Sequence, residues 1–253
     1  MKWEEKLNKF IDSFEYIDDV VGILVCGSYI TGSPTKHSDL DVHLLLNDKV
    51  NYRVRGNKIV DGLLIEYFAN PKSQIIKYFE EDYKNIRPMS HTQFITGKII
   101  MDKTGDLKKL KEKAKNMLKN NYEDIDTSIS DMDKYAMWDM LDDLKDIYET
   151  ERDDFDFIYY CNLDRLICIY MRHIKYPYNK KTILGNIVSE IVRKKYLLKE
   201  LPDYDIKELI EYCITVKNKE SKMRCYKKLT EKIFDIVGGF SIDNFKYKSD
   251  IEK

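Results

Sequence analysis

The pattern of apolar residues changes near residue 120, and this change constrains the fold more than any other feature of the sequence. Before it, short β-branched runs that end at glycine or aspartate alternate with helical patterns, as in a mixed α and β domain. After it, apolar residues repeat at helical spacing and glycine and proline are sparse. We therefore expect an α+β fold: a domain at residues 1–120 with a small mixed β-sheet flanked by helices, and an all-α helical bundle at residues 121–253.

Periodicity also locates individual elements. Helices are expected at 3–18 and 71–83, and a hairpin is expected at 52–60 around Gly56 and Asn57. The expected strands are 20–26, 40–46, 63–68 and 99–101. Further helices are expected near 106–119, 130–150, 154–175, 183–198, 205–215 and 221–237.

Charge and composition disfavour several classes of protein. The chain has 43 basic and 44 acidic residues, which disfavours a nucleic-acid binder because phosphate binding calls for an excess of positive charge. No stretch approaches the roughly 18 apolar residues of a membrane span, and acidic residues near the start do not fit a secretory signal. We expect a cytoplasmic protein. Five cysteines without CxxC spacing favour neither a disulfide framework nor a zinc site.

Two carboxylates lie close together in the second expected strand. Asp39 and Asp41 are two residues apart on an extended segment, so both side chains point to the same face. Two neighbouring carboxylates repel each other unless a divalent cation neutralises them, and oxygen ligands of this kind suit Mg²⁺. The same face carries His43 farther along, where we expect a satisfied histidine on the sheet face rather than a ligand.

A candidate phosphate site precedes this pair. Gly27 and Ser28 end the first strand and open a short helix. Glycine lets the backbone approach a ligand closely, and free N–H groups with a serine hydroxyl suit a phosphate. Together with the aspartates, they describe a site for a nucleoside triphosphate with Mg²⁺.

A third acid, Glu66, stands in an otherwise apolar strand, where an unpaired charge is costly. A neighbouring strand can bring it beside Asp39 and Asp41, as a third metal ligand, a general base, or both. Two alternatives stay open: a salt bridge of Glu66 on an edge strand, and Asp61 as the third acid.

These residues carry a resemblance. The pattern of Gly27-Ser28, ten residues, Asp39-x-Asp41 and a later strand acid resembles the nucleotidyltransferase superfamily that includes DNA polymerase beta. Residues 26–32 and 36–42 are most similar to the aminoglycoside and lincosamide nucleotidyltransferases, and residues 96–105 resemble the hairpin that ends their catalytic domain. The resemblance covers roughly residues 20–120.

The resemblance implies an N-terminal nucleotidyltransferase domain and Mg-dependent transfer of AMP from ATP to a hydroxyl, with release of pyrophosphate. Gly27 and Ser28 would hold the triphosphate, Asp39 and Asp41 would bind two Mg²⁺ ions, and Glu66 would be the base or third ligand. The implied partners are a small, cationic, aminoglycoside-like antibiotic and a nucleoside triphosphate, with neither nucleic acid nor membrane. We expect the active site in the cleft between the two domains, and a homodimer that completes this cleft is an open alternative.

The expected second domain contains an acidic helix. Residues 123–156 hold 14 acidic and 3 basic residues. Asp142, Asp143 and Asp146 lie opposite the apolar stripe of this helix, with Trp138 at its edge. They form either a solvated face or the wall of an acceptor site, in which carboxylates pair with ammonium groups and the indole stacks on a ring. Lys180 and Lys181 are either solvated loop residues or ligands of the triphosphate.

Two other functions remain alternatives to an antibiotic-modifying enzyme. The first is a protein-adenylylating nucleotidyltransferase, such as the antitoxins that modify a partner toxin, although these are usually shorter. The second is a catalytically silent nucleotide-binding module, against which the acids at 39, 41 and 66 argue.

Overall fold

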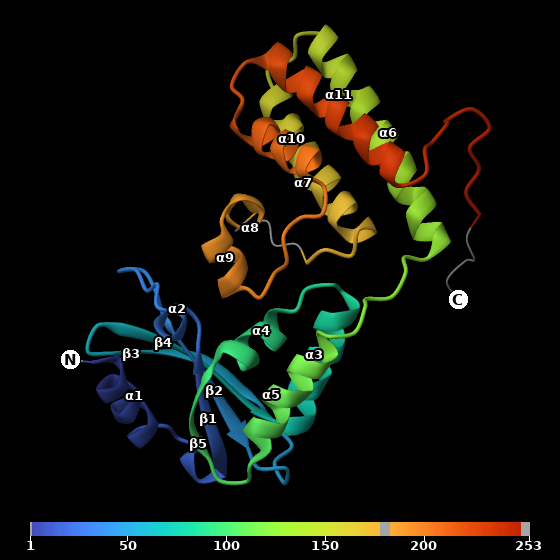
Figure 1. The fold of residues 1–253 in the computed structure, drawn as a ribbon. Coiled ribbons are helices and arrows are strands. Elements are labelled where there is room, and N and C mark those ends of the chain that lie inside the picture. The colour runs from blue at the N-terminus through green and yellow to red at the C-terminus, as the bar shows by residue number, and fades with distance from the viewer. Residues whose placement is uncertain (1, 178–182, 249–253) are drawn as a thin grey trace. The chain divides into compact units, whose positions relative to one another are not determined.

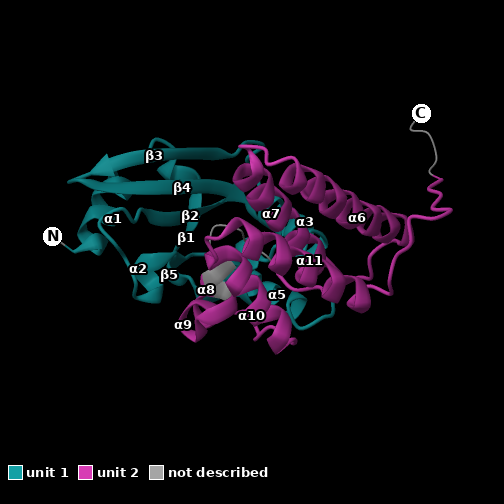
Figure 2. Cartoon of the chain, turned by 90° about the horizontal axis from the view of Figure 1, so that it is seen from above, with its two compact units in different colours: residues 1–122 teal, residues 123–253 magenta. Residues whose placement is uncertain are grey.

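A computed structural model describes residues 2–177 and 183–248 (Figure 1). The chain divides into two compact units, residues 1–122 and residues 123–253 (Figure 2). The first unit combines a sheet with helices, and the described part of the second is helical. The expected α+β fold is confirmed.

A five-stranded mixed sheet forms the centre of the first unit, in the order β3-β4-β2-β1-β5. Strands β2 and β4 are parallel, and the other neighbouring pairs are antiparallel. The strands are β1 (Val20–Cys26), β2 (Leu40–Leu46), β3 (Val54–Val60), β4 (Leu63–Pro71) and β5 (Lys98–Asp102).

Helices cover both faces of this sheet, so β1 and β2 at its centre are buried on both sides. This explains why both strands read as almost continuous apolar runs. Helix α1 (Trp3–Asp12) packs against one face. The opposite face is covered by α3 (Lys72–Lys84), α4 (Met89–Thr96) and α5 (Asp106–Met117). Two short elements complete the unit, η1 (Ile17–Asp19) and α2 (Ser28–Thr31).

The hairpin predicted around Gly56 and Asn57 is wrong, because both residues lie inside β3. A side chain at Gly56 would collide with the Tyr67 hydroxyl on β4, which explains the glycine within a strand. The chain turns instead at Asp61 and Gly62, whose φ angles are 47° and 77°. A two-residue hairpin turn with positive φ at both positions favours an Asp-Gly pair.

Three other expectations need correction in this unit. Helix α1 ends at Asp12, because the Ser13 hydroxyl donates to the carbonyl of Phe10 and the chain then leaves the helical path. Helix α4, which begins after Pro88, was missed. Residues 96–105 form no hairpin: they contain the single strand β5, and Gly105 precedes α5 with φ 74°.

The second unit packs its helices around one apolar core. Several of these helices begin at side-chain caps; for example, Asp126 accepts from the Ser128 N–H at 2.8 Å. The single helix expected at 183–198 is two helices, because Ser189 interrupts it and caps the second. The helices are α6 (Thr127–Glu149), α7 (Phe155–His173), α8 (Ile183–Val188), α9 (Glu190–Lys195), α10 (Tyr204–Thr215) and α11 (Lys219–Ile236).

Within the described ranges, no helix combines the length and the apolar character that crossing a membrane requires.

Candidate active site

Three acidic side chains meet where β1, β2 and β4 lie side by side. In the strand register, Cys26 is opposite Asp41, and Asp41 is opposite Glu66. Side chains of directly opposed residues project to the same face of a sheet. Asp39 joins them from the residue before β2, and one carboxylate oxygen from each of the three acids lies within 4.8 Å of the others. The structure therefore brings together the three acids that the sequence singled out.

The three carboxylates repel one another, and partial burial strengthens the effect. Burial first, and then the charges of Asp39 and Glu66, raise the pKa of Asp41 to about 6. A divalent cation among the oxygens would remove this repulsion, and carboxylate oxygens are the donors that Mg²⁺ takes. The donor set therefore fits magnesium. The neighbouring Cys26 thiol is no nucleophile, because burial, Asp41 and Asp39 raise its pKa and keep it protonated.

Gly27 connects β1 to α2 in a conformation that favours glycine, with φ 75° and ψ −158°. A Cβ atom at this position would collide with Oδ2 of Asp41. Ser28 follows as the first residue of α2, whose turn is closed by the N–H groups of Ile30 and Thr31 on the Gly27 carbonyl. The backbone thus passes directly beside the Asp41 carboxylate, with a serine next in the chain.

A basic side chain that sequence reasoning missed lies beside Glu66. The Nη2 atom of Arg55 is 2.7 Å from Oε1 of Glu66, and the guanidinium lies 4.8 Å from the ring centroid of Phe68. Arg55 is directly opposite Phe68 in the β3–β4 register, two positions along β4 from Glu66. Glu66 therefore has both an ion pair and a place in the acidic cluster, which the sequence treated as alternatives.

A signal for Arg55 was present in the sequence. Alternation counted back from a turn at Asp61 and Gly62 places Arg55 on the same face as Glu66. The mistaken turn at Gly56 hid this register.

Asp61, the rival for the third acid, lies in the β3–β4 turn and pairs with Lys9 at 2.8 Å. It is not part of the acidic cluster.

His43 follows the acids along β2 and is buried between two rings. Its ring centroid is 5.2 Å from that of Phe68 and 4.9 Å from that of Phe94. Burial lowers its pKa to about 4, although Gln93 and Glu66 act in the opposite direction. Its Nε2 atom has no hydrogen-bond partner among the described residues, so the ring is a neutral core group but not a fully satisfied one.

The site residues expected in the second domain lie on α6 or outside the described residues. Met137 and Leu144 are buried, as the apolar stripe predicted. Trp138 is half-buried, and its ring centroid lies 6.3 Å from that of Tyr135. The three aspartates are exposed to solvent: Asp142, Asp143 and Asp146. Lys180 and Lys181 lie outside the described residues.

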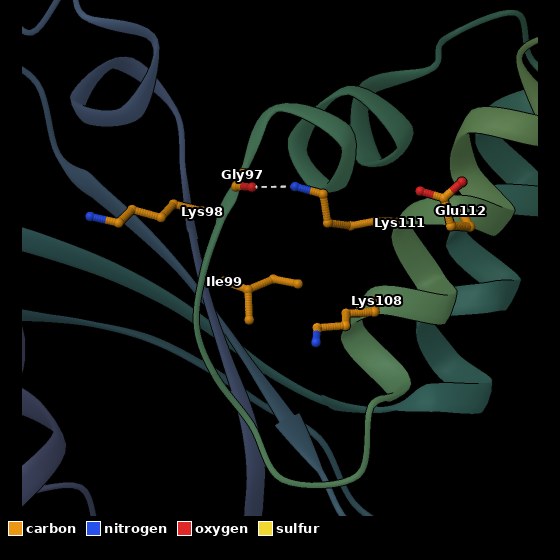
Figure 3. Close-up of a pocket in the computed structure, with 6 residues that line it drawn as sticks. All are labelled: Gly97, Lys98, Ile99, Lys108, Lys111 and Glu112. Carbon is orange, nitrogen blue, oxygen red and sulfur yellow. Dashed lines mark hydrogen bonds between the residues drawn. The ribbon is translucent and has the colours of Figure 1, made fainter.

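A separate cavity of about 430 Å³ lies beside the edge strand β5 (Figure 3). Lys111 reaches across it to donate a hydrogen bond to the Gly97 carbonyl, and Lys98 points away from Lys111. None of the three clustered acids lines this cavity. Its lining residues are Gly97, Lys98, Ile99, Lys108, Lys111 and Glu112.

Comparison with known protein families identifies the first unit. Residues 5–104, which include the three clustered acids, match the sequence profile of the family described as the nucleotidyltransferase domain. The chain therefore carries a nucleotidyltransferase domain, and the expectation of a nucleotidyltransferase enzyme is confirmed. The match is to the domain family as a whole and does not distinguish the aminoglycoside and lincosamide branch.

Two individual proteins are also similar. A protein of Methanocaldococcus jannaschii named "Putative protein adenylyltransferase MJ1305" is 26% identical over 127 residues, which is 46% of this chain and 86% of that protein. The crystal structure of a nucleotidyltransferase-like protein from Exiguobacterium sibiricum aligns with a TM-score of 0.48 and 11% identity. That alignment covers 93% of this chain and 75% of the other.

Proposed function

We propose that this nucleotidyltransferase transfers the adenylyl group of ATP to a hydroxyl of its acceptor, with Mg²⁺ at Asp39, Asp41 and Glu66. The observation that carries the proposal is the convergence of these three carboxylates, within 4.8 Å of one another, beside the turn at Gly27. The acceptor hydroxyl attacks the α-phosphorus, the bond to the β,γ-diphosphate breaks, and pyrophosphate leaves.

Each residue of this cluster has a role that its position supports. Asp39 and Asp41 supply oxygen ligands for magnesium, and up to two ions are expected. When bound, magnesium supplies stabilisation of the negative charge on attacking and leaving oxygens. Gly27 leaves room beside Asp41, and Ser28 offers a hydroxyl and a backbone N–H to the phosphates. The Glu66 carboxylate orients the acceptor hydroxyl and takes its proton, or ligates the metal.

The similarity to a protein named for protein adenylylation favours ATP as the donor and a protein hydroxyl as the acceptor. A serine, threonine or tyrosine side chain on a partner protein supplies the attacking oxygen in this version of the function. This is the acceptor class that we place first.

A small cationic antibiotic is the second candidate acceptor, supported by one feature of the second unit. Asp142, Asp143 and Asp146 are exposed on α6, and the half-buried Trp138 lies on the same helix. Exposed carboxylates attract ammonium groups, and an indole face binds a cation or a sugar ring.

The test is a transfer assay with ATP labelled at the α-phosphate. Purified protein is incubated with labelled ATP and Mg²⁺, with and without EDTA. One arm contains protein extracts, and the other contains aminoglycosides and lincosamides. We expect Mg-dependent transfer of label in one arm, with stoichiometric release of pyrophosphate.

A matched pair of variants makes this assay decisive. Asp39→Asn removes a clustered acid, and Asp61→Asn removes an acid of the same unit that lies outside the cluster. Transfer lost in the first variant and retained in the second supports the proposal. Mg·ATP binding without transfer in either arm indicates the silent module, and failure to bind Mg·ATP contradicts the assignment of the site.

A further inference from the structure

Arg55 is the one basic residue that forms an ion pair with the acidic cluster, as far as the described residues show. The 2.7 Å ion pair joins Nη2 of Arg55 to Oε1 of Glu66. The second oxygen of that carboxylate, Oε2, is not part of this ion pair. Asp39 and Asp41 have no ion-pair partner in the described part of the chain. Among the described residues, the cluster therefore contains two acids without an ion-pair partner and one acid that pairs with a guanidinium.

Folding stability does not account for this pair. The Arg55 side chain is 72% exposed, and an ion pair with so exposed a partner contributes little to folding stability because water screens it. Strands β3 and β4 are already joined along a seven-residue register from Val54 to Val60. Removal of the guanidinium leaves that register in place.

The ring of Phe68 gives the guanidinium a fixed position. The guanidinium carbon lies 4.8 Å from the ring centroid, a cation–π distance, and the ring itself is stacked on the buried His43. A planar guanidinium supported from below in this way directs its N–H groups along a fixed line, which a lysine ammonium cannot do. The layer of His43, Phe68 and Arg55 thus connects the buried core to Glu66.

We propose that Arg55 is a positioning residue that holds one oxygen of Glu66 and so directs the other toward the reacting groups. The proposal rests on the proposed function. A glutamate side chain has three rotatable bonds, and a ligand or base must be held within about 0.5 Å of its working position. Asp39 and Asp41 have shorter side chains and depend less on such support.

The same contact allows an opposite reading, in which Arg55 competes with the metal for Glu66. The two readings differ in how Arg55→Ala changes the contribution of Glu66 to metal binding. With positioning, the glutamate contributes less once the arginine is gone. With competition, it contributes more, because no cation occupies its oxygen.

A double-mutant cycle on Mn²⁺ binding separates these readings without any need for turnover. Mn²⁺ is titrated, with detection by electron paramagnetic resonance, into the wild type, Glu66→Gln, Arg55→Ala and the double variant. We expect Glu66→Gln to raise the Kd for Mn²⁺ when Arg55 is present. In the Arg55→Ala background, the same substitution should raise the Kd by a factor that is about three times smaller. An equal or larger loss in that background overturns the proposal.

Turnover gives the second readout. We expect Arg55→Ala to lower kcat by about 10- to 100-fold, the usual cost of losing a group that orients a metal ligand. Arg55→Lys should recover only part of this loss, and guanidinium ions at millimolar concentration should recover activity in Arg55→Ala but not in the wild type. Unchanged kcat in Arg55→Ala contradicts the proposal.

Arg53→Ala is the matched control, because Arg53 precedes β3 and donates to the Tyr78 hydroxyl rather than to a clustered acid. It should keep the wild-type kcat and Mn²⁺ affinity. If the wild type transfers no label to any acceptor, the proposed function fails, and the Mn²⁺ cycle still decides the role of Arg55.

Discussion

Acidic residues gather in both units of this chain, but in two different ways. In the first unit, Asp39, Asp41 and Glu66 come from two parallel neighbouring strands and the loop before one of them, and they are partly buried. In the second, aspartates such as Asp142 and Asp146 lie along one helix and are exposed to water. The second unit has more acidic residues than the first, yet among the described residues only the first unit brings oxygens from three acids within 4.8 Å of one another.

The difference shows that position, rather than the number of acidic residues, forces carboxylates close to one another. Neighbouring strands fix their Cβ atoms about 5 Å apart, so carboxylates at opposed positions cannot avoid one another. On an exposed helix, water and rotamer freedom let the side chains separate, and salt screens the field that remains. The cluster in the first unit therefore calls for a cation, whereas the α6 face can only attract one.

The largest expected effect separates the two acidic regions by activity. Asp39→Asn should lower nucleotidyl transfer at least about a hundredfold, because the site would lose a carboxylate ligand of the magnesium that stabilises negative charge on the reacting oxygens. Asp142→Asn should leave kcat unchanged. The measurement is Mg-dependent release of pyrophosphate at saturating ATP. Equal losses of activity in both variants would contradict the distinction between the clustered acids of the first unit and the exposed acids of α6.

The second prediction concerns pH and the buried His43. Its pKa is about 4 in the folded protein and 6.5 when unperturbed, so only the unfolded chain takes up this proton between those values. The free energy of unfolding should therefore fall as pH falls from about 6.5 to about 4, by up to about 3.4 kcal/mol from this group.

The two tryptophans allow this to be measured in one unit at a time. Trp3 is in the first unit and Trp138 in the second, so Trp138→Phe leaves a fluorescence reporter for the first unit only. In that background, His43→Leu should show a weaker loss of stability on acidification. The control is His37→Gln, which removes an exposed histidine of the same unit and should keep the original pH dependence.

The sequence predicted those parts of the fold and site that depend on one strand at a time. Strands β1 and β2 were placed at their observed residues because burial on both faces makes them continuous apolar runs. The face shared by Asp39 and Asp41 followed from alternation alone. Glu66 was singled out as a candidate third acid because an unpaired charge in an apolar strand is costly.

The rest depended on how segments pair with one another. Gly56 was read as a turn because its real constraint, the Tyr67 hydroxyl, belongs to the next strand. That error hid the register that places Arg55 beside Glu66. Helix α4 was missed because it is only eight residues long and begins after Arg87-Pro88. Whether the α6 aspartates bind an acceptor depends on which molecule comes near them. The periodicity of apolar residues predicts only which face of the helix is buried.

The third prediction tests the cost of the clustered charges. The pKa of Asp41 is about 6 in the folded protein against 3.8 when unperturbed, so folding is favoured while this group is protonated. The stability that the folded protein gains from a protonated Asp41 is fully present below about pH 3.8 and is lost as pH rises through about 6. At pH 8 without metal, Asp41→Asn should therefore raise the free energy of unfolding of the first unit, by up to about 3 kcal/mol.

Magnesium supplies the control for this prediction. Mg²⁺ should stabilise the wild type against urea and should stabilise Asp41→Asn much less, because the variant has lost a ligand. The reporter is again Trp3 fluorescence in the Trp138→Phe background. A variant that is less stable than the wild type in EDTA would mean that the ionised Asp41 has a partner that offsets its repulsion.

The smallest expected effect belongs to the α6 face. Asp142→Asn and Asp146→Asn should each change the free energy of unfolding of the second unit by less than about 0.5 kcal/mol, because exposed charges are hydrated in both states. Trp138 reports this in a Trp3→Phe background. The same variants should raise KM for a cationic acceptor and leave KM for ATP unchanged. Unchanged KM values for both substrates would reduce α6 to a solvated face and leave the protein acceptor as the stronger candidate.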